Sequence, residues 1–201
     1  MRTINFHPRS FWNRGGVVLS AIMLAGTVIV SVATPAEGTQ HDHWSSSSDR
    51  DEIEDLAYCY AAATDAIGRG DVQGGKDLYH TCFTPNAAIG ASYPGSDPNG
   101  PPDLVSNGPD AWAAVVQSVF ATAGYESTQH MMSNIRISIQ GNTATMTSYL
   151  NATHVLDPYT GVNIANGTYE DVVVRTPAGW RIKKRTLRLI SFVHLESPPA
   201  P

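Results

Sequence analysis

The C-terminal half of this chain alternates apolar and polar residues, which is the pattern of strands half buried in a sheet. Ile135, Ile137 and Ile139 alternate with polar neighbours, and so do Val172 and Val174. Short glycine-containing turns separate the alternating segments. Four strands are therefore predicted, at residues 127–140, 143–157, 164–176 and 180–195. Strands joined in this way form an antiparallel sheet.

Helical patterns dominate the part of the chain that precedes these strands. Residues 51–71 open with acidic side chains and end at Gly68 and Gly70, which predicts a helix. Its apolar positions recur at helical spacing and are Ile53, Leu56, Ala57, Tyr60 and Ala61. Further helices are predicted at 72–83 and, beginning with proline, at 109–123.

Between the second and third helices we expect, within residues 84–92, a turn that leads to a short strand, and then a long loop. Residues 92–108 are dense in proline, glycine, serine and asparagine. Such a loop in a compact domain is often a lid or a rim element. The whole order predicts an α+β cone, in which N-terminal helices pack on a curved antiparallel sheet and enclose a pocket.

The first 36 residues have the features of a secretory signal peptide. Arg2, Arg9 and Arg14 occur without any acidic residue, and the apolar run 15–32 follows them. Small residues then suit cleavage after Ala36. We expect a secreted or periplasmic protein. If the segment is not cleaved, it would be a membrane anchor, because the apolar run approaches spanning length.

Composition sets the remaining boundaries and excludes one class of partner. The polar, serine-rich residues 37–50 are predicted to be a linker, residues 51–195 the domain, and 196–201 a disordered tail. The formal net charge is −5, and the only basic run, 181–188, alternates with apolar residues as the outer face of a strand would. No nucleic-acid partner is therefore expected.

The only two cysteines, Cys59 and Cys82, leave two alternatives open. An exported protein with an even number of cysteines can form one disulfide. Both residues also lie on apolar stretches, where buried free cysteines are common. The sequence does not give the Cα separation that would decide between them.

Two histidines, His130 and His154, lie on consecutive predicted strands at equal distances from the turn at 141–142. A hairpin closed there would make them approximate cross-strand partners, although the alternation around them does not decide which face each occupies. Near the end of the first helix, Asp65 shares a face with Tyr58 and small residues. A carboxylate on such a face is unfavourable unless it is paired, and the alternative is a solvated helix end.

A histidine with a partner carboxylate is the smallest arrangement that can remove a proton at neutral pH, because the carboxylate orients the imidazole and stabilises its charged form. A metal site would require a third ligand, and no such spacing occurs, so no metal site is predicted. No nucleophile-elbow motif is present either. Met131, which follows His130, fits adaptable filling of a pocket or core.

The third long strand carries three polar residues in a row. Tyr169 and Asp171 should share one face and Glu170 the other. Two roles remain open for this group: a contribution to a pocket, or ion pairs with Arg185 or Arg188 on the next strand.

Together, four stretches resemble the SnoaL-like branch of the NTF2-like superfamily, which includes scytalone dehydratase, bile-acid 7α-dehydratase and hexachlorocyclohexane dehydrochlorinase. The resemblance extends from about residue 51 to residue 191. The stretches are "IEDLAYCYAAATDAIGRGD", "FTPNAAI", "TQHMMSNIRISIQGNTATMTSYLNATHV" and "GTYEDVVVRTPAGWRIKKRTLRL".

The resemblance implies a histidine base supported by an aspartate from the first helix. The aspartate nine residues after Leu56 matches Asp65, and the histidine at the start of the first long strand matches His130. A second histidine one hairpin later matches His154, and the tyrosine five residues before the aspartate matches Tyr60. Substrate-binding roles are expected for Tyr58, the competing tyrosine, and for Met131 and Tyr169.

The resulting hypothesis is a cofactor-independent lyase of the dehydratase type, or an isomerase. It would act on a small hydrophobic molecule, cyclic ones included, by proton abstraction at His130. The alternative is a non-catalytic module that binds a small ligand or a protein, because this fold carries both kinds of function. A homodimer or higher homo-oligomer is expected. Membrane contact is expected only through an uncleaved N-terminal segment.

Overall fold

The computed structural model describes residues 40–156 and 160–196, with side chains from residue 48 onward. The predicted signal peptide and the predicted disordered tail, residues 197–201, lie outside the described residues. No helix within the described ranges is both long enough and apolar enough to cross a membrane. The elements are α1 (Gln40–Gly68), α2 (Val72–Cys82), β1 (Phe83–Ser92), β2 (Leu104–Asn107), α3 (Pro109–Ala123), β3 (Tyr125–Gln140), β4 (Thr143–Leu156), β5 (Gly161–Thr176) and β6 (Gly179–Glu196).

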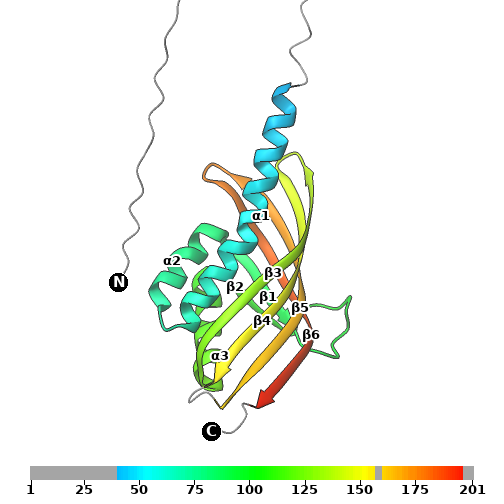
Figure 1. The fold of residues 1–201 in the computed structure, drawn as a ribbon. Coiled ribbons are helices and arrows are strands. Elements are labelled where there is room, and N and C mark those ends of the chain that lie inside the picture. The colour runs from blue at the N-terminus through cyan, green and yellow to red at the C-terminus, as the bar shows by residue number, and fades with distance from the viewer. Residues whose placement is uncertain (1–39, 157–159, 197–201) are drawn as a thin grey trace, which may run out of the picture. The chain divides into compact units, whose positions relative to one another are not determined.

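The six strands form one curved sheet with the order β2-β1-β6-β5-β4-β3 (Figure 1). The last four strands are the predicted antiparallel meander. However, β1 runs parallel to β6, so the sheet is mixed and the prediction of a wholly antiparallel sheet was wrong at this pairing. Between β1 and β6 the chain passes through α3 and three long strands. No hairpin therefore fixes their relative direction.

β2 was not predicted, since it lies inside the segment expected to be loop. It pairs antiparallel with β1 at the edge of the sheet. Only Ser106 of its four residues is buried, so the strand leaves almost no apolar alternation in the sequence. Proline and glycine directly before it strengthened the prediction of a loop.

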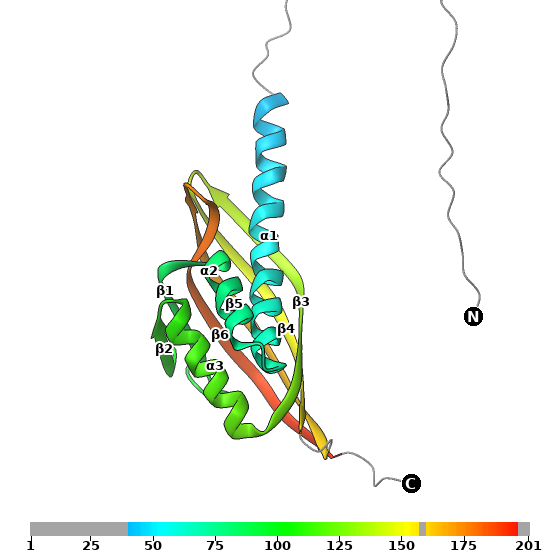
Figure 2. The ribbon, with the colours of Figure 1, turned by 90° about the vertical axis from the view of Figure 1, so that its left-hand side faces the viewer.

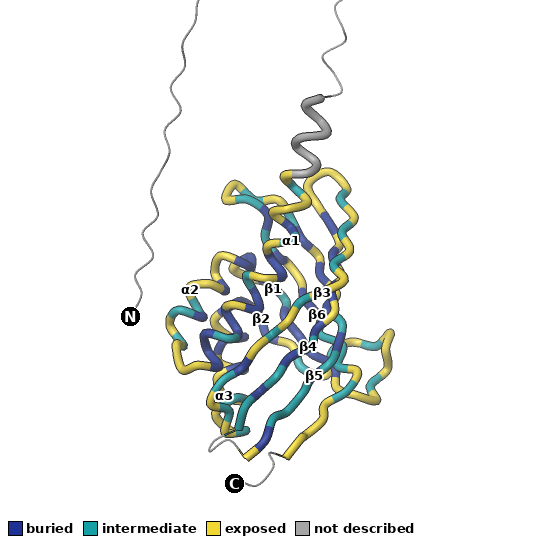
Figure 3. Tube along the Cα trace, viewed as in Figure 1, coloured by how far each residue is buried: buried dark blue, intermediate teal, exposed yellow. Residues whose placement is uncertain are grey.

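All three helices lie on one face of the sheet, with the core between the two layers (Figures 1 and 2). The predicted apolar stripe of α1 is buried there (Figure 3). The boundaries predicted for α3 are those observed, and the helix ends at Gly124, whose φ of 72° is the left-handed value that favours glycine. The α+β class with helices covering a curved sheet is confirmed.

α1 begins earlier than predicted, at Gln40, so residues 40–50 are helical and not linker. Contacts with the sheet fix the last two residues of this extension. Asp49 accepts a hydrogen bond from Trp180 Nε1 at 3.1 Å and forms an ion pair with Arg175. Arg50 donates to the backbone oxygen of Ile137 at 3.2 Å. These contacts are tertiary, and the polar composition of the segment gave no sign of them.

Cys59 of α1 and Cys82 of α2 form a disulfide, with their Cα atoms 5.9 Å apart. The two helices also approach closely at Gly75, where a Cβ atom would lie only 2.7 Å from the backbone oxygen of Ala63. Glycine is required at this crossing, because a side chain would collide with the backbone of α1. The disulfide alternative is thus the one that the structure supports.

Candidate active site

Asp65 and His130 meet where the end of α1 packs against β3. His130 Nδ1 lies 2.7 Å from Asp65 Oδ1, and the His130 backbone N–H donates to Asp65 Oδ2 at 3.0 Å. Thr128 Oγ1 donates to Asp65 Oδ1 at 2.9 Å. Both side chains are largely shielded, with exposed fractions of 13% for Asp65 and 6% for His130. The carboxylate is therefore paired, and the alternative of a solvated helix end is excluded.

Glycine makes this contact between α1 and β3 possible. A Cβ atom on Gly68 would lie 2.2 Å from Thr128 Oγ1, so a larger residue would push the end of the helix away from the strand. Because Asp65 lies one turn earlier on α1, that displacement would also separate it from His130. The glycine that marks the helix end in the sequence thus also sets the distance within the pair.

Hydrogen bonding fixes the chemical form of the pair. Burial raises the pKa of Asp65, but the side-chain and backbone hydrogen bonds of His130 outweigh burial and hold the pKa below its usual value. An ionised carboxylate only accepts hydrogen bonds, so Nδ1 of His130 carries a proton. In neutral His130, Nε2 then has the free lone pair. His130 lines a pocket between the helices and the sheet, which places that lone pair where a ligand could meet it.

His154 shares the inner face of the sheet with His130, although the two are not directly opposite. His154 pairs with Thr128, and His130 with Ala152, so the histidines are diagonal neighbours. Their ring centroids are 5.5 Å apart. A bulge between Ser133 and Arg136 produces this register. The predicted proximity is confirmed, and the predicted direct pairing is shifted by two residues.

His154 is held in its neutral form. Burial, followed by the nearby charge of His130, lowers its pKa to about 4. His154 Nδ1 lies 3.3 Å from the backbone oxygen of Asn163, which can only accept, so the proton sits on Nδ1. Nε2 of His154 is therefore a hydrogen-bond acceptor at neutral pH.

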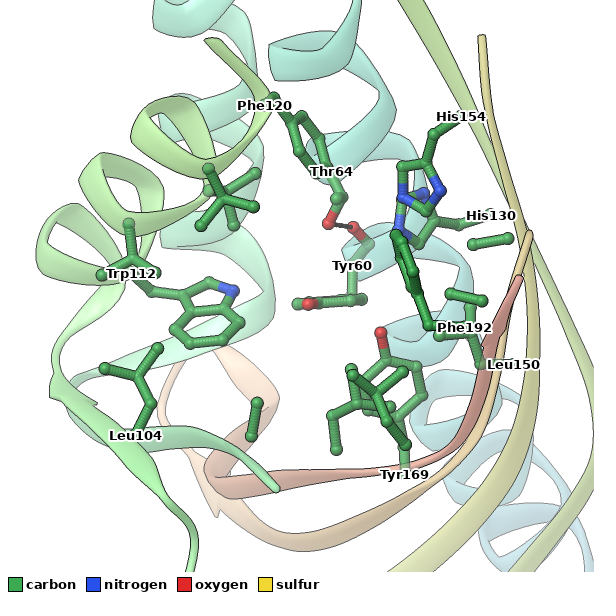
Figure 4. A pocket seen from close by; sticks show the side chains of 18 of the residues that line it. Tyr60, Thr64, Leu104, Trp112, Phe120, His130, Leu150, His154, Tyr169 and Phe192 are labelled. Atoms are coloured by element: carbon green, nitrogen blue, oxygen red, sulfur yellow. Dashed lines mark hydrogen bonds between the residues drawn. The ribbon is translucent and has the colours of Figure 1, made fainter. Parts of the chain in front are cut away.

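The pocket between α1, α3 and the inner face of the sheet has a volume of about 150 Å³ (Figure 4). Most of its wall is apolar. Polar groups enter from few side chains, chiefly the two histidines, Tyr60, Tyr169 and Thr64. Apolar lining residues include Leu104, Val116, Val119, Phe120, Leu150 and Phe192. A mostly apolar pocket with few convergent polar groups is typical of small-molecule sites.

A buried ion pair lies behind the tyrosines of this pocket. Arg185 donates two hydrogen bonds to Asp171, at 2.8 and 2.7 Å, and both side chains are fully buried. The guanidinium carbon lies 4.2 Å from the ring centroid of Tyr60 and 4.5 Å from that of Tyr169. Burial raises the pKa of Asp171, although the charge of Arg185 opposes that rise. Of the two roles left open for the Tyr169 strand, both are present: Tyr169 lines the pocket, and Asp171 pairs with Arg185.

Arg185 was expected on the outer face of the last strand, and that prediction was wrong. A bulge in β6 lies where Val172 pairs with Lys184 and Val173 with Ile182. The extra residue, Lys183, shifts the alternation, so Lys183 and Lys184 are both exposed and Arg185 turns inward. A simple period of two cannot predict a bulge.

Two of the predicted substrate-binding residues lie away from the pocket. Tyr58 is 46% exposed, and its hydroxyl donates to Glu54 on the surface of α1. It lies at the edge of the buried helix face, two turns before the point where α1 meets β3. Met131 is 50% exposed because it follows His130 on a strand and so points to the opposite face. Both predictions were wrong. Tyr60 and Tyr169 do line the pocket.

Sequence reasoning missed the contribution of α3. Trp112, Val116, Val119 and Phe120 of this helix all line the pocket. Their helical spacing is visible in the sequence, but the same spacing is expected of ordinary core residues. In the part of the chain that the structure describes, no three histidine, cysteine, aspartate or glutamate side chains gather into a metal site.

The fold and this paired site define an NTF2-like cone with a histidine–aspartate pair in its pocket. Residues 45–186 match the model of the SnoaL-like domain. The chain therefore belongs to the SnoaL-like family, as the resemblance implied. No curated protein sequence matches the chain.

Solved structures agree on the fold. A proposed scytalone dehydratase from Novosphingobium aromaticivorans is 22% identical with a TM-score of 0.59, over 78% of this chain and 93% of its own. Hexachlorocyclohexane dehydrochlorinase LinA-type3 from Novosphingobium barchaimii is 15% identical with a TM-score of 0.59, over 80% and 100%. A cystatin-like protein of unknown function from Nostoc punctiforme is 18% identical with a TM-score of 0.51, over 70% and 90%. At these identities the likeness shows the fold alone.

Proposed function

We propose that this protein is an exported, cofactor-independent lyase of the dehydratase type, or an isomerase, that acts on a small hydrophobic molecule. The observation that carries the proposal is the 2.7 Å contact between Asp65 and His130 in the wall of an apolar pocket. A general base requires a free lone pair that faces the substrate and a partner that stabilises its protonated form. His130 has both.

The proposed step begins when His130 Nε2 takes a proton from a carbon of the substrate. The electron pair of the broken C–H bond then forms a carbon–carbon double bond. In an elimination, the leaving group departs from the neighbouring carbon with its own electron pair. In an isomerisation, a neighbouring carbonyl oxygen takes up the displaced electron pair, which gives an enolate conjugated to a second carbon–carbon double bond. The carbonyl forms again when His130 returns the proton to the far carbon of that second bond. Asp65 stabilises the imidazolium in both cases.

Two further residues would orient the substrate. The neutral His154 presents Nε2 as an acceptor beside the base, which suits a substrate hydroxyl. Tyr60 lines the same pocket and can donate its hydroxyl proton to a carbonyl or a departing oxygen. His154 Nε2 can only accept a hydrogen bond, whereas the Tyr60 hydroxyl can donate one, so the two groups would recognise different ends of a substrate.

Export is part of the proposal and has two supports. The first 36 residues carry the signal pattern, and the domain contains a disulfide. Disulfides persist in oxidising compartments and are rare in reducing ones.

The test compares His130→Ala with the wild type. The panel should contain one-ring hydroxy-ketones and halogenated rings, with steroids as larger comparators. Substrate loss is followed by mass spectrometry, and proton abstraction by deuterium uptake from D₂O. We expect His130→Ala to lower the rate by about 10²- to 10⁴-fold. Replacing the exposed His80 of α2 by alanine is the matched control, with an unchanged rate expected. Equal turnover and equal deuterium uptake by wild type and His130→Ala would contradict the assignment.

A further inference from the structure

Large apolar side chains that remain half exposed border the mouth of the pocket. Tyr93, Val119 and Phe192 all line the pocket, and their exposed fractions are 55%, 52% and 50%. They come from three parts of the chain, since Tyr93 directly follows β1, Val119 lies on α3 and Phe192 lies on β6. Exposed apolar side chains that gather around one opening mark a contact surface. These three residues form the rim of the pocket.

The loop that was predicted to be a lid or a rim element holds one member of this rim. Residues 93–103 connect β1 to β2, and both Tyr93, which opens the loop, and Leu104, which follows it, line the pocket. Asp103 Oδ2 accepts hydrogen bonds from the backbone N–H of Tyr93 at 2.8 Å and from Ser96 Oγ at 2.6 Å. One carboxylate therefore ties the two ends of the loop together beside the pocket.

Tyrosine is suited to this position at the mouth. Ala91 of β1 lines the pocket, and the period of two along a strand puts Tyr93 on the same face. Ala91 also pairs with Leu104, so the strand pairing reaches almost to the base of the loop. A tyrosine at such a place can turn its ring toward a ligand while its hydroxyl stays in water. Strand pairing and the Asp103 hydrogen bonds together favour a fixed rim over a lid that closes.

Pocket size indicates what the rim would contact. A volume of about 150 Å³ is that of an apolar cavity able to hold one benzene-sized ring. Any further part of a bound molecule must extend through the mouth, where the rim is apolar. Phe192 lies beside the proposed catalytic site, with its ring centroid 6.2 Å from that of His154, and Figure 4 shows it on the same side of the pocket as His130. A group on the rim therefore stays attached to a ring that His130 can reach.

We propose that the rim binds an apolar substituent of the ring that occupies the pocket. The inference deepens the proposed function by naming a substrate with two apolar parts, and it rests on that function only in taking the pocket as the substrate site. Tyr93, Val119 and Phe192 are then specificity-determining residues. Asp103 is a positioning residue, because it acts through Tyr93.

The experiment uses two probes, cyclohexanone and 4-cyclohexylcyclohexanone, which share one ring and differ by an apolar second ring. Equilibrium dialysis measures the affinity of each. The wild type should bind the two-ring probe more tightly, and Tyr93→Ala should weaken that binding about three- to tenfold while cyclohexanone binding stays nearly unchanged. Asp103→Ala should also weaken only the two-ring probe, by a smaller factor, because the Tyr93 ring is still present but no longer held.

Each variant has a matched control. Tyr149 is as exposed as Tyr93 but lies on the outer face of the sheet, so Tyr149→Ala should change neither affinity. Asp97 accepts a hydrogen bond from the backbone N–H of Asn99 within the same loop, at 2.9 Å, and Asp97→Ala should likewise leave both affinities unchanged.

Three results would overturn the inference. They are equal weakening of both probes by Tyr93→Ala, a two-ring probe that is indifferent to Tyr93→Ala, and a wild type that binds both probes equally. The ratio of the two affinities can also be measured in His130→Ala, which lacks the proposed base. The rim and the proton abstraction can thus fail separately.

Discussion

His130 and His154 are the same residue type on one sheet face, yet their neighbours give them opposite tasks. The Nδ1–H of His130 donates to a carboxylate, which orients the ring and leaves Nε2 as its free nitrogen. The Nδ1 proton of His154 goes to a neutral carbonyl in a buried setting, which favours the uncharged ring. A difference of one hydrogen-bond partner therefore separates a proposed base from a proposed acceptor.

His154 makes stability depend on pH. Its pKa is about 4 in the folded chain and about 6.5 when unfolded, so the unfolded chain binds more protons between these values. Stability is then complete above pH 6.5 and declines as the pH falls toward 4. Between pH 7 and pH 5 we expect a loss of about 2 kcal/mol from this residue.

The measurement is urea unfolding at both pH values. His154→Phe should reduce the loss by about that amount. Thr145→Val, a change at an exposed position of the same strand that involves no titratable group, should keep the wild-type dependence. An identical pH dependence in His154→Phe and the wild type would contradict a depressed pKa.

At the scale of elements, one bulge in β3 decides whether the site exists. Near the turn, Arg136 pairs with Thr147, but beyond the bulge Ser133 pairs with Tyr149. Without the extra residue, His154 would pair with Gln129 and point away from His130. Asn134, inside the bulge, has a φ of 52°, in the left-handed region that asparagine tolerates better than most residues.

The effect of a substitution at Asn134 on stability should therefore depend more on the backbone conformation that the new residue tolerates than on its polarity. We expect Asn134→Val to lower the free energy of unfolding by about 1–2 kcal/mol, because a β-branched residue is strained at positive φ. Asn134→Gly should be at least as stable as the wild type, since glycine adopts this conformation freely. Chemical denaturation of both variants measures the difference. Ser138→Val, at an exposed regular position of β3, is the control, and a loss there equal to that of Asn134→Val would refute the argument.

At the scale of the whole molecule, the disulfide ties the two helices that carry and support Asp65. It joins residues 23 positions apart. Constraining a loop of this length in the unfolded chain stabilises the fold by about 3 kcal/mol.

Reduction should accordingly lower the free energy of unfolding by about 3 kcal/mol, measured by denaturation with and without a thiol reductant. The double variant Cys59→Ser with Cys82→Ser should show the same loss and no response to reductant. If the reductant leaves the wild-type transition unmoved although free thiols are detected, the bridge contributes nothing to stability.

The N-terminal segment also makes a prediction about processing. Expressed with residues 1–36 present in a bacterial host, the protein should be recovered outside the cytoplasm with Glu37 as its first residue, because small residues precede that position. N-terminal sequencing and intact mass test this. Full-length protein that remains with the membrane fraction would favour an uncleaved anchor instead.

The local pattern of apolar and polar residues was sufficient to predict most of the fold. Helical spacing placed the buried face of α1 and the bounds of α3, and alternation placed the four long strands. The turn at 141–142 brought His130 and His154 to neighbouring strands. These features depend on residues close together in the sequence, so one sequence is enough to predict them.

The sequence by itself thus determined the class of fold, the pairing of the two histidine-bearing strands and the residue types that could remove a proton. Only the tertiary structure decided which of these side chains meet. Bulges reversed the face of His130 relative to the turn and brought Arg185 into the core. Tyr58 and Met131 are exposed and lie outside the site, and the packing of α3 places Trp112 in the wall of the pocket. The reason is geometric: a one-residue change of register moves every later side chain to the other face, and composition and periodicity do not record where it occurs.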